Sequence, residues 1–223
     1  MLQVEDFFDL SSFRDKGLFS NVEYVWDVLK KRDAYIQKVL KPRLLGKISE
    51  RAIIEGEVSI GKGSVIEPGA MIVGPAIIGE NTLVRQGAYV RGNVIIGNNC
   101  IIGHASEVKG TIILNNTELS HFNYVGDSII GSDVLLGAGV RTANVKITGG
   151  TIRVTIGDKN YETELVKFGG IVGDKVQLGC NSVFNPGTLV GKRTLVYSNV
   201  SLRGYYHGNQ IVKLKQNIVK TSF

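Results

Sequence analysis

An aliphatic residue recurs at every sixth position through the first half of the chain. The series covers twelve consecutive positions: Ile48, Ile54, Ile60, Ile66, Ile72, Ile78, Val84, Val90, Ile96, Ile102, Val108 and Leu114. A period of six fits neither the 3.6-residue repeat of a helix nor the two-residue alternation of a strand. It is typical of a solenoid in which each hexapeptide forms one short strand and one turn. Because one hexapeptide cannot bury its aliphatic side chain alone, the coils must stack.

A slimmer side chain follows each large one after four positions. These residues are mostly small or β-branched: Ala52, Val58, Ser64, Ala70, Ala76, Thr82, Ala88, Val94, Cys100 and Ser106. The pattern predicts two inward side chains per hexapeptide and leaves the others in water. Glycine after the large residue, as at Gly61 and Gly79, suits tight corners. We therefore predict an all-β chain of stacked parallel strands.

The repeat is interrupted near the middle of the chain. The first run covers residues 48–119, and sixteen residues separate Leu114 from Ile130, where three hexapeptides would take eighteen. We interpret Ser120 to Asp127 as a segment out of register. A break in a strict repeat is a candidate functional site.

A second interruption covers residues 142–167. Alternation over Thr151–Ile156 and the Gly157-Asp158 pair predict a β-hairpin-like loop. Hexapeptides then resume, with large residues at Val172, Leu178, Phe184, Val190, Val196 and Leu202. The tail, residues 207–223, alternates weakly, and either a last strand or a cap fits it.

Residues 1–46 lack the repeat. Apolar positions between Asn21 and Leu40 favour one or two amphipathic helices, with Asn21 or Asp15 as possible caps. Because a solenoid end exposes its core and an unpaired edge, we expect this segment to cover the first coil. The predicted organisation is a helical segment 1–46, a β-helix 47–206 and a tail 207–223.

The composition restricts the class of protein. A hydrophobic content of 43% in 24.2 kDa is enough for one domain with a sizeable core. No apolar run is long enough to span a bilayer, and the acidic start is unlike a signal peptide, so we expect a cytoplasmic protein. We assign Cys100 and Cys180 to slim inward positions, as core thiols.

The net charge of +6 points to anionic ligands or to simple solubility. The basic residues are dispersed and do not alternate with stacking aromatic residues. We therefore expect a small polyanionic ligand, with no nucleic acid and no membrane as partner.

His121 lies in the first interruption, three residues before Tyr124. Histidine is the usual general base near neutral pH, although it also fills irregular corners in purely structural roles. A metal site is the rival reading, because His104 lies seventeen residues before His121, nearly one coil away. The third ligand would have to be His207 or a partner's residue, so no metal is expected.

Arg91 and Lys109 are eighteen residues apart, the length of three hexapeptides. If three hexapeptides form a coil, the two cations stack on one face and attract an anion such as phosphate. The alternative is a solvated face on which Glu107 pairs with Lys109. Cys180 and Ser198 are likewise eighteen residues apart.

Residues 120–145 read SHFNYVGDSIIGSDVLLGAGVRTANV. The spacing of H-x-x-Y-x-G-D, G-A-G and T-A-N resembles the acetyltransferase domain of bifunctional glucosamine-1-phosphate acetyltransferase/N-acetylglucosamine-1-phosphate uridyltransferases. It looks closest to archaeal-type sugar-phosphate nucleotidyltransferases. The resemblance runs from about residue 48 to 205 and does not include the uridyltransferase half. It implies a left-handed parallel β-helix with three hexapeptides per coil, and a homotrimer with sites between protomers.

The resemblance also implies roles for individual residues. His121 matches the base that takes a proton from the sugar amine, and Asn144 matches a residue that holds the substrate and the acetyl group. Substrate-binding matches are Arg91, Lys109 and Tyr124. Positions matching the groove for acetyl-coenzyme A, the expected co-substrate, are Ala138, Cys180 and Ser198. A backbone N–H near Ala138 is the expected oxyanion donor.

Two positions depart from the family pattern. Leu135 stands where the family usually has an asparagine that contacts the sugar, and Gly150 stands about where a loop lysine is common. Lys146 or Arg153 could replace that lysine. The leading hypothesis is an acetyl-coenzyme A-dependent N-acetyltransferase for an amino-sugar phosphate. The alternatives are a non-catalytic trimeric scaffold and acyl transfer to another sugar acceptor.

Overall fold

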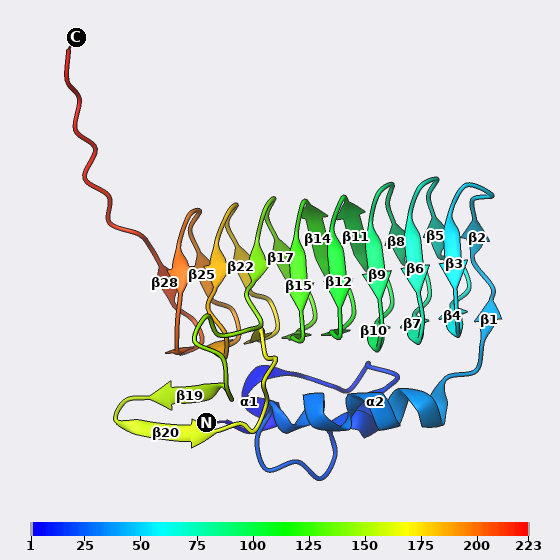
Figure 1. The fold of residues 1–223 in the computed structure, drawn as a ribbon, viewed down its shortest axis with the longest axis horizontal. Helices are drawn as coiled ribbons and strands as arrows, with labels where there is room; N and C mark the ends of the chain where they lie inside the picture. The colour runs from blue at the N-terminus through cyan, green and yellow to red at the C-terminus, as the bar shows by residue number, and fades with distance from the viewer. Residues whose placement is uncertain (1, 223) are drawn as a thin grey trace.

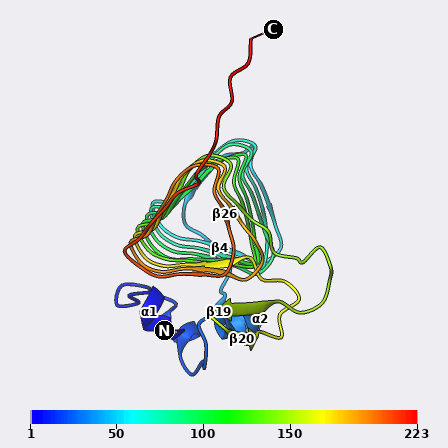
Figure 2. The same ribbon diagram turned by 90° about the vertical axis from the view of Figure 1, so that its left-hand side faces the viewer.

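The computed structural model describes residues 2–222. Three parallel sheets form the faces of a triangular prism, and each coil adds one strand to each sheet in turn (Figures 1 and 2). We name them sheets A, B and C. The predicted stack of parallel strands is confirmed, with three hexapeptides per coil.

The strands of the three sheets are two to four residues long. Sheet A contains, in spatial order, β1 Arg43–Leu44, β4 Val58–Ile60, β7 Ala76–Ile78, β10 Val94–Ile96, β13 Ile112–Ile113, β16 Ile129–Ile130, β21 Gly170–Val172, β24 Thr188–Val190 and β27 Tyr205–Tyr206. Sheet B contains β2 Lys47–Ile48, β5 Val65–Ile66, β8 Leu83–Val84, β11 Ile101–His104, β14 Glu118–His121, β17 Leu135–Leu136, β22 Gln177–Leu178, β25 Leu195–Val196 and β28 Ile211–Val212. Sheet C contains β3 Ile53–Glu55, β6 Met71–Val73, β9 Tyr89–Arg91, β12 Glu107–Lys109, β15 Tyr124–Gly126, β18 Arg141–Thr142, β23 Val183–Phe184 and β26 Ser201–Leu202.

The large aliphatic residues fill the interior of the prism as predicted. In sheet A, Ile60 pairs with Ile78 and Ile78 with Ile96, eighteen residues apart, and all three are fully buried. Each coil therefore covers the aliphatic layer of the coil before it, which is how a short hexapeptide acquires a core.

The interruption in the repeat is different from the predicted one. Ile96 pairs with Ile113, and Ile113 with Ile130, so two successive coils are seventeen residues long. The missing residue in each lies at the corner between sheets C and A. Ile113, not Leu114, faces the interior, and Leu114 packs toward the N-terminal segment. Residues 120–127 are not out of register, since they supply β14 and β15.

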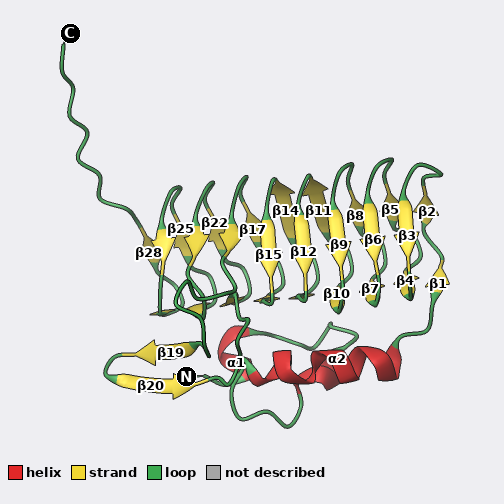
Figure 3. Cartoon of the chain, viewed as in Figure 1, coloured by secondary structure: helices red, strands yellow, loops and turns green. Residues whose placement is uncertain are grey.

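The outer face of sheet A is also buried, which corrects the expectation that side chains outside the prism face water. Its outward residues belong to a second core together with the N-terminal segment: Ile77, Ile95, Ile112, Ile129, Ile171 and Leu189. Trp26 and Phe7 are among the fully buried residues that cover them. The helices lie along this one side of the prism (Figure 3).

We expected the N-terminal segment to cover the first coil, and the structure shows that it does not. It contains α1 Val4–Phe7, the 3-10 helix η1 Lys16–Phe19 and α2 Asp27–Val39. It begins beside late coils, where the N–H of Asp174 donates to the carbonyl of Phe7, and only α2 returns the chain to β1 in the first coil (Figure 1). Asp15 precedes η1 without a side-chain capping bond, and the residue before α2 is Trp26 rather than Asn21.

The predicted hairpin is present in the long insertion. β19 Arg153–Ile156 pairs antiparallel with β20 Lys159–Glu162. Tyr161 contacts the edges of the Tyr24 and Trp26 rings, so the hairpin packs on the N-terminal segment.

The tail begins with a last strand, since β28 pairs with β25. Beyond Val212 the described residues form no helix or strand, and Ile218 is exposed. None of the helices within residues 2–222 has the length and apolar content needed to cross a membrane.

We expect Trp26→Ala to lower the free energy of unfolding by about 3–5 kcal/mol, the usual cost of emptying a buried aromatic site. Trp26→Phe should cost less, because it keeps an aromatic ring and removes a buried indole N–H that has no partner within residues 2–222. Urea unfolding measures both. An unchanged midpoint for Trp26→Ala would show that the covering layer contributes nothing to stability.

Candidate functional site

The corner between sheets B and C carries a column of predicted site residues. His121 of β14 pairs in register with His104 of β11, the neighbouring strand of the coil before. Above it, the N–H of Gly139 donates to the carbonyl of His121, that of Asn181 to Ala138 and that of Asn199 to Cys180. These bonds stack His121, Ala138, Cys180 and Ser198 on successive coils. The structure therefore brings the predicted base and the predicted acetyl-coenzyme A residues together on one edge.

His121 is exposed at this corner, and its ring centroid lies 6.2 Å from that of Phe122. Phe122 adopts a left-handed backbone, with φ of 55°, and its side chain is 57% exposed. Equivalent corners use Gly139 and Asn181, which tolerate this conformation more readily. Phe122, to which the sequence pattern assigned no role, places an exposed aromatic ring beside the candidate base at a cost in backbone strain.

The column also corrects one expectation. Cys180 is exposed and does not occupy a slim inward position; Ser182, two residues later, is the fully buried residue of that hexapeptide. Cys100 is buried as predicted. The N–H groups of Gly137 and Gly139 donate to the carbonyls of Leu178 and His121, so of the three the N–H of Ala138 itself stays the predicted oxyanion donor.

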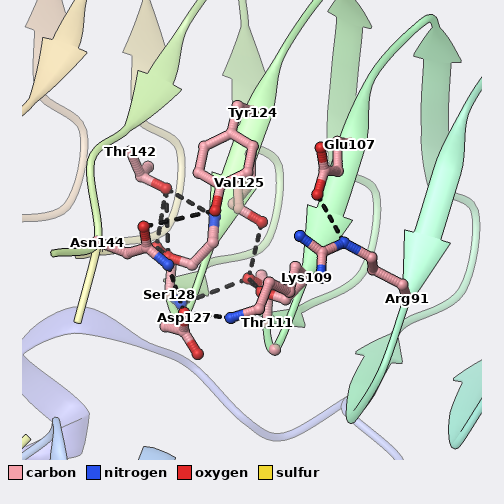
Figure 4. A network of polar contacts seen from close by, with 12 residues as sticks. Arg91, Glu107, Lys109, Thr111, Tyr124, Val125, Asp127, Ser128, Thr142 and Asn144 are labelled. Carbon is pink, nitrogen blue, oxygen red and sulfur yellow. Dashed lines mark hydrogen bonds and ion pairs between the residues drawn. The ribbon is translucent and has the colours of Figure 1, made fainter. Parts of the chain in front are cut away.

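The outer face of sheet C carries the predicted anion site. Arg91 pairs in register with Lys109, so the two cations stack on neighbouring strands as predicted. Each already has an acidic partner (Figure 4). Arg91 Nε donates to Glu107 at 2.7 Å, a contact that raises the pKa of the guanidinium, and Lys109 Nζ donates to Asp127 at 3.0 Å. Glu107 thus pairs with Arg91, not with Lys109.

Asp127 is the centre of a largely buried polar cluster. Its carboxylate accepts hydrogen bonds from Lys109 and, at 2.5 Å, from the side-chain amide of Asn144 (Figure 4). Arg32 Nη1 of α2 lies 3.8 Å from the other carboxylate oxygen. The Asp127 side chain is only 9% exposed. Lys109 and Asn144 were predicted as site residues, whereas Asp127 and Arg32 had no predicted role.

Tyr124 extends this cluster along sheet C. Its hydroxyl donates to the Asn144 side-chain oxygen at 3.4 Å. Burial raises the pKa of Tyr124, and the Glu107 and Asp127 carboxylates raise it further. Gly126 leaves the needed space, because a Cβ there would lie 2.7 Å from the Tyr124 hydroxyl and 2.9 Å from the Asn144 amide nitrogen.

Hydroxyl groups inside the prism form hydrogen bonds with the backbone of this part of sheet C. Thr142 Oγ1 accepts a hydrogen bond from the N–H of Gly126, and Ser128 Oγ donates to the carbonyl of Gly126 (Figure 4). Thr111 Oγ1 donates to the carbonyl of Val125. Thr111 and Ser128 occupy the interior position that Val94 has in the preceding coil, and Thr142 pairs in register with Val125 and Phe184. Their hydroxyl groups therefore satisfy backbone groups at the shortened corners.

A cavity of about 370 Å³ adjoins the cluster. Its charged lining residues are Arg32, Arg91, Lys109 and Asp127. Glycines of successive corners, Gly74, Gly92 and Gly110, form part of its wall. A cavity in which three cations and one carboxylate are the charged lining residues, on a glycine-rich surface, suits a small anion.

The predicted site therefore divides between the two edges of sheet C. His121 lies before β15, at the corner between sheets B and C. Asn144 lies after β18, at the corner between sheets C and A, so one protomer does not place these two together as a catalytic pair. Asn144 instead contacts Tyr124 and Asp127, beside the cation pair. Sheet C lies between the two groups.

The positions that depart from the family pattern lie outside the Asp127 cluster. Leu135 is on sheet B, paired with Glu118 and Gln177, and is exposed. Gly150 is in the insertion, with open space around it. Lys146 and Arg153 line a separate cavity of about 420 Å³ under the insertion.

The histidine pair shows no further metal ligands. His104 Nδ1 lies 2.8 Å from the carbonyl oxygen of Gln86. Among residues 2–222 no group of three or more His, Cys, Asp or Glu side chains is arranged to hold a metal ion.

Comparison with known proteins confirms the resemblance. A family model described as the GMPPB C-terminal domain matches residues 72–161. A bifunctional protein GlmU from Methanococcus maripaludis is 41% identical over 205 residues, 92% of this chain and 49% of the relative. One from Methanocaldococcus jannaschii is 33% identical over 203 residues, 91% of this chain and 49% of the relative. The chain spans about half the length of these curated relatives.

The fold is also found among solved structures. A UDP-N-acetylglucosamine acyltransferase from Francisella novicida matches 70% of this chain and 58% of its own, with a TM-score of 0.50 and 20% identity. The chain has the predicted left-handed parallel β-helix fold.

We expect the two thiols to react at very different rates. Burial raises the pKa of Cys100 to about 12, so its thiolate is scarce at pH 8, whereas Cys180 is exposed. A chromogenic disulfide reagent should modify one thiol quickly in the native protein and the second only in denaturant. Cys180→Ser should abolish the fast phase and Cys100→Ser should keep it. A fast phase that survives in Cys180→Ser would contradict the assignment.

Proposed function

We propose that the protein is an acetyl-coenzyme A-dependent N-acetyltransferase acting on an amino-sugar phosphate such as glucosamine-1-phosphate. The main observation is that one sheet carries a cation-lined cavity at one edge and a column containing His121 and Cys180 at the other. The similarity to half of each GlmU relative supports acyl transfer to a sugar. The substrate follows from the anion site and from the resemblance.

The acceptor would lie across sheet C. Its phosphate would bind beside Arg91 and Lys109, and its hydroxyl groups would meet Tyr124. The phosphate fits there because guanidinium and ammonium groups are the side chains that bind such oxygens. Asn144 would act from within the Asp127 cluster, as a substrate contact.

The donor would lie along the column. Ala138, Cys180 and Ser198 are stacked on successive coils above His121, which gives an extended ligand a continuous edge. Side chains there are small, so the thioester of acetyl-coenzyme A could approach the backbone closely.

The chemistry needs one proton acceptor. The amine nitrogen attacks the thioester carbonyl, a C–N bond forms, and the C–S bond breaks as the coenzyme A thiolate leaves. His121 accepts the proton that the nitrogen loses. Binding both substrates against one rigid sheet would supply proximity.

We propose a homotrimer with its sites between protomers. Exposed aliphatic side chains mark the outer face of sheet B, namely Leu135, Leu195 and Ile211. Gln177 lies between Leu135 and Leu195, and Leu195 is next to Ile211, so the surface is mixed, with exposed aliphatic side chains that suit contact with a second copy. A partner could then bring its own residues to His121, since one protomer keeps His121 and Asn144 at opposite edges.

Two other functions, a scaffold without activity and acyl transfer to another acceptor, are the alternatives to this proposal. A non-catalytic scaffold is suggested by Leu135, which stands where the family usually has an asparagine that contacts the sugar, and by Gly150, which stands about where a loop lysine is common. Transfer to another sugar acceptor is the other. Thiol release from acetyl-coenzyme A, measured with glucosamine-1-phosphate, galactosamine-1-phosphate and unphosphorylated amino sugars, separates the proposed reaction from transfer to another acceptor. Binding of acetyl-coenzyme A separates both transferases from the scaffold.

We expect His121→Ala to reduce turnover roughly 10²–10⁴-fold, the usual contribution of a general base, without changing the fold. His207→Ala is the matched control, because His207 is also exposed but lies in the last coil, away from the column. Thiol release gives the rate and circular dichroism checks folding. Wild-type turnover in His121→Ala would remove His121 from the mechanism, and absence of turnover with every amino sugar would favour the scaffold.

We expect a coenzyme A analogue to protect Cys180. Desulfo-coenzyme A has no thiol of its own and should slow maleimide labelling of Cys180 until binding saturates, because the ligand would cover the column. Labelling is followed by mass spectrometry, with glucose-1-phosphate as the control ligand. If labelling stays equally fast at high analogue concentration, the donor binds elsewhere.

A further inference from the structure

We propose that Arg32 of α2 is a third cation of the anion site and selects phosphorylated acceptors. This inference rests on the proposed function for the identity of the substrate. The acceptor site would then include a residue of the N-terminal segment, whose other role is to cover the outer face of sheet A.

The shortened corners bring Arg32 to the site. Between sheets C and A, one earlier coil uses Gly92 and Asn93, whereas the seventeen-residue coils use only Gly110 or Asp127. Nη1 of Arg32 donates to the carbonyl of Gly110 at 2.5 Å. The corner is therefore held directly against α2.

Glycine at position 110 makes this approach possible. Its φ is 54°, and a Cβ there would lie 2.7 Å from Asp127 Oδ1 and 3.2 Å from Arg32 Nη1. Any side chain would thus crowd the space in which the Arg32 guanidinium and the Asp127 carboxylate meet. The positive φ value and the close contacts both require glycine at position 110.

The charges around the cavity favour a dianion. Arg32, Arg91 and Lys109 line it together with one carboxylate, Asp127. Two further carboxylates pair with the guanidinium groups, Glu107 with Arg91 and Asp33 with Arg32, and both are partly exposed. A ligand that displaces these two carboxylates meets an excess of two positive charges. A phosphate monoester carries close to two negative charges at neutral pH. Without Arg32 the excess would be one, which no longer matches the dianion.

The geometry of Arg32 suits this role. Its side chain is only 11% exposed and is fixed by Gly110, by Asp33 at 2.8 Å and by proximity to Asp127. A guanidinium held in place loses little entropy on binding and presents several donors to phosphate oxygens. Low exposure also weakens screening by salt.

The test compares the affinity of Arg32 variants for glucose-1-phosphate, which has a hydroxyl where the reactive amine would be. We expect Arg32→Gln to raise the dissociation constant roughly tenfold, as measured by isothermal titration calorimetry. Arg32→Lys should keep most of the affinity, because it retains the charge. Glutamine and lysine can both donate to the carbonyl of Gly110, so a purely structural role predicts equal dissociation constants for the two variants.

Lys38→Gln is the matched control, since it removes one positive charge from an exposed position of the same helix. Its affinity should stay at the wild-type value. Equal dissociation constants for Arg32→Gln and Lys38→Gln, in folded proteins, would overturn the proposal. So would a failure of wild-type protein to bind glucose-1-phosphate or inorganic phosphate.

The result is separable from the proposed activity. Wild-type turnover with unchanged affinity in Arg32→Gln would overturn the third cation and leave acetyl transfer in place. Weaker binding in Arg32→Gln, in a protein without turnover on any amino sugar, would support the third cation and count against the proposed reaction.

Discussion

Parallel stacking of short coils is the constraint on which the rest of this structure depends. Once Ile78 lies on Ile96 and Ile96 on Ile113, every corner residue is placed above its counterpart in the coil before. Positions that are far apart in sequence then become neighbours along an edge, as Ala138 and Cys180 do across the insertion. The column at the B–C corner is therefore a consequence of core packing, and a chemical group at one corner can be extended by single substitutions in adjacent coils.

The N-terminal segment changes the character of one sheet. Most solenoid faces have an inner side in the core and an outer side in water, but sheet A is buried on both because the segment contributes residues such as Trp26 and Phe7. This burial explains why sheet A strands carry aliphatic residues at inner and outer positions alike. It also fixes α2 against the C–A corner, where Arg32 meets Gly110, so the same contact layer that stabilises the fold reaches the candidate anion site.

The repeat in the sequence was sufficient to predict the solenoid, whereas the coil length of three hexapeptides came from the family resemblance. The stacking of Arg91 on Lys109 followed from that coil length. The repeat could not place the shift in register, because Ile113 and Leu114 are both large aliphatics and either could face the interior. Cys180 was misplaced for a related reason: the position of a small residue within a hexapeptide is ambiguous once the phase is uncertain. Arg32 had no local signal at all, since its place depends on packing between segments some eighty residues apart.

The acidic partners of the cations explain how such a site stays ordered before a ligand arrives. Leaving Lys109 and Arg32 largely buried without a counter-charge would be costly, and Asp127 offsets that cost while fixing their positions. The two carboxylates differ in their freedom to move. Asp127 is 9% exposed and bonded to Asn144, whereas Glu107 is 32% exposed at the surface of sheet C. A phosphate that displaced only Glu107 from Arg91 would therefore find the other cations already in position, with little reorganisation left to oppose binding.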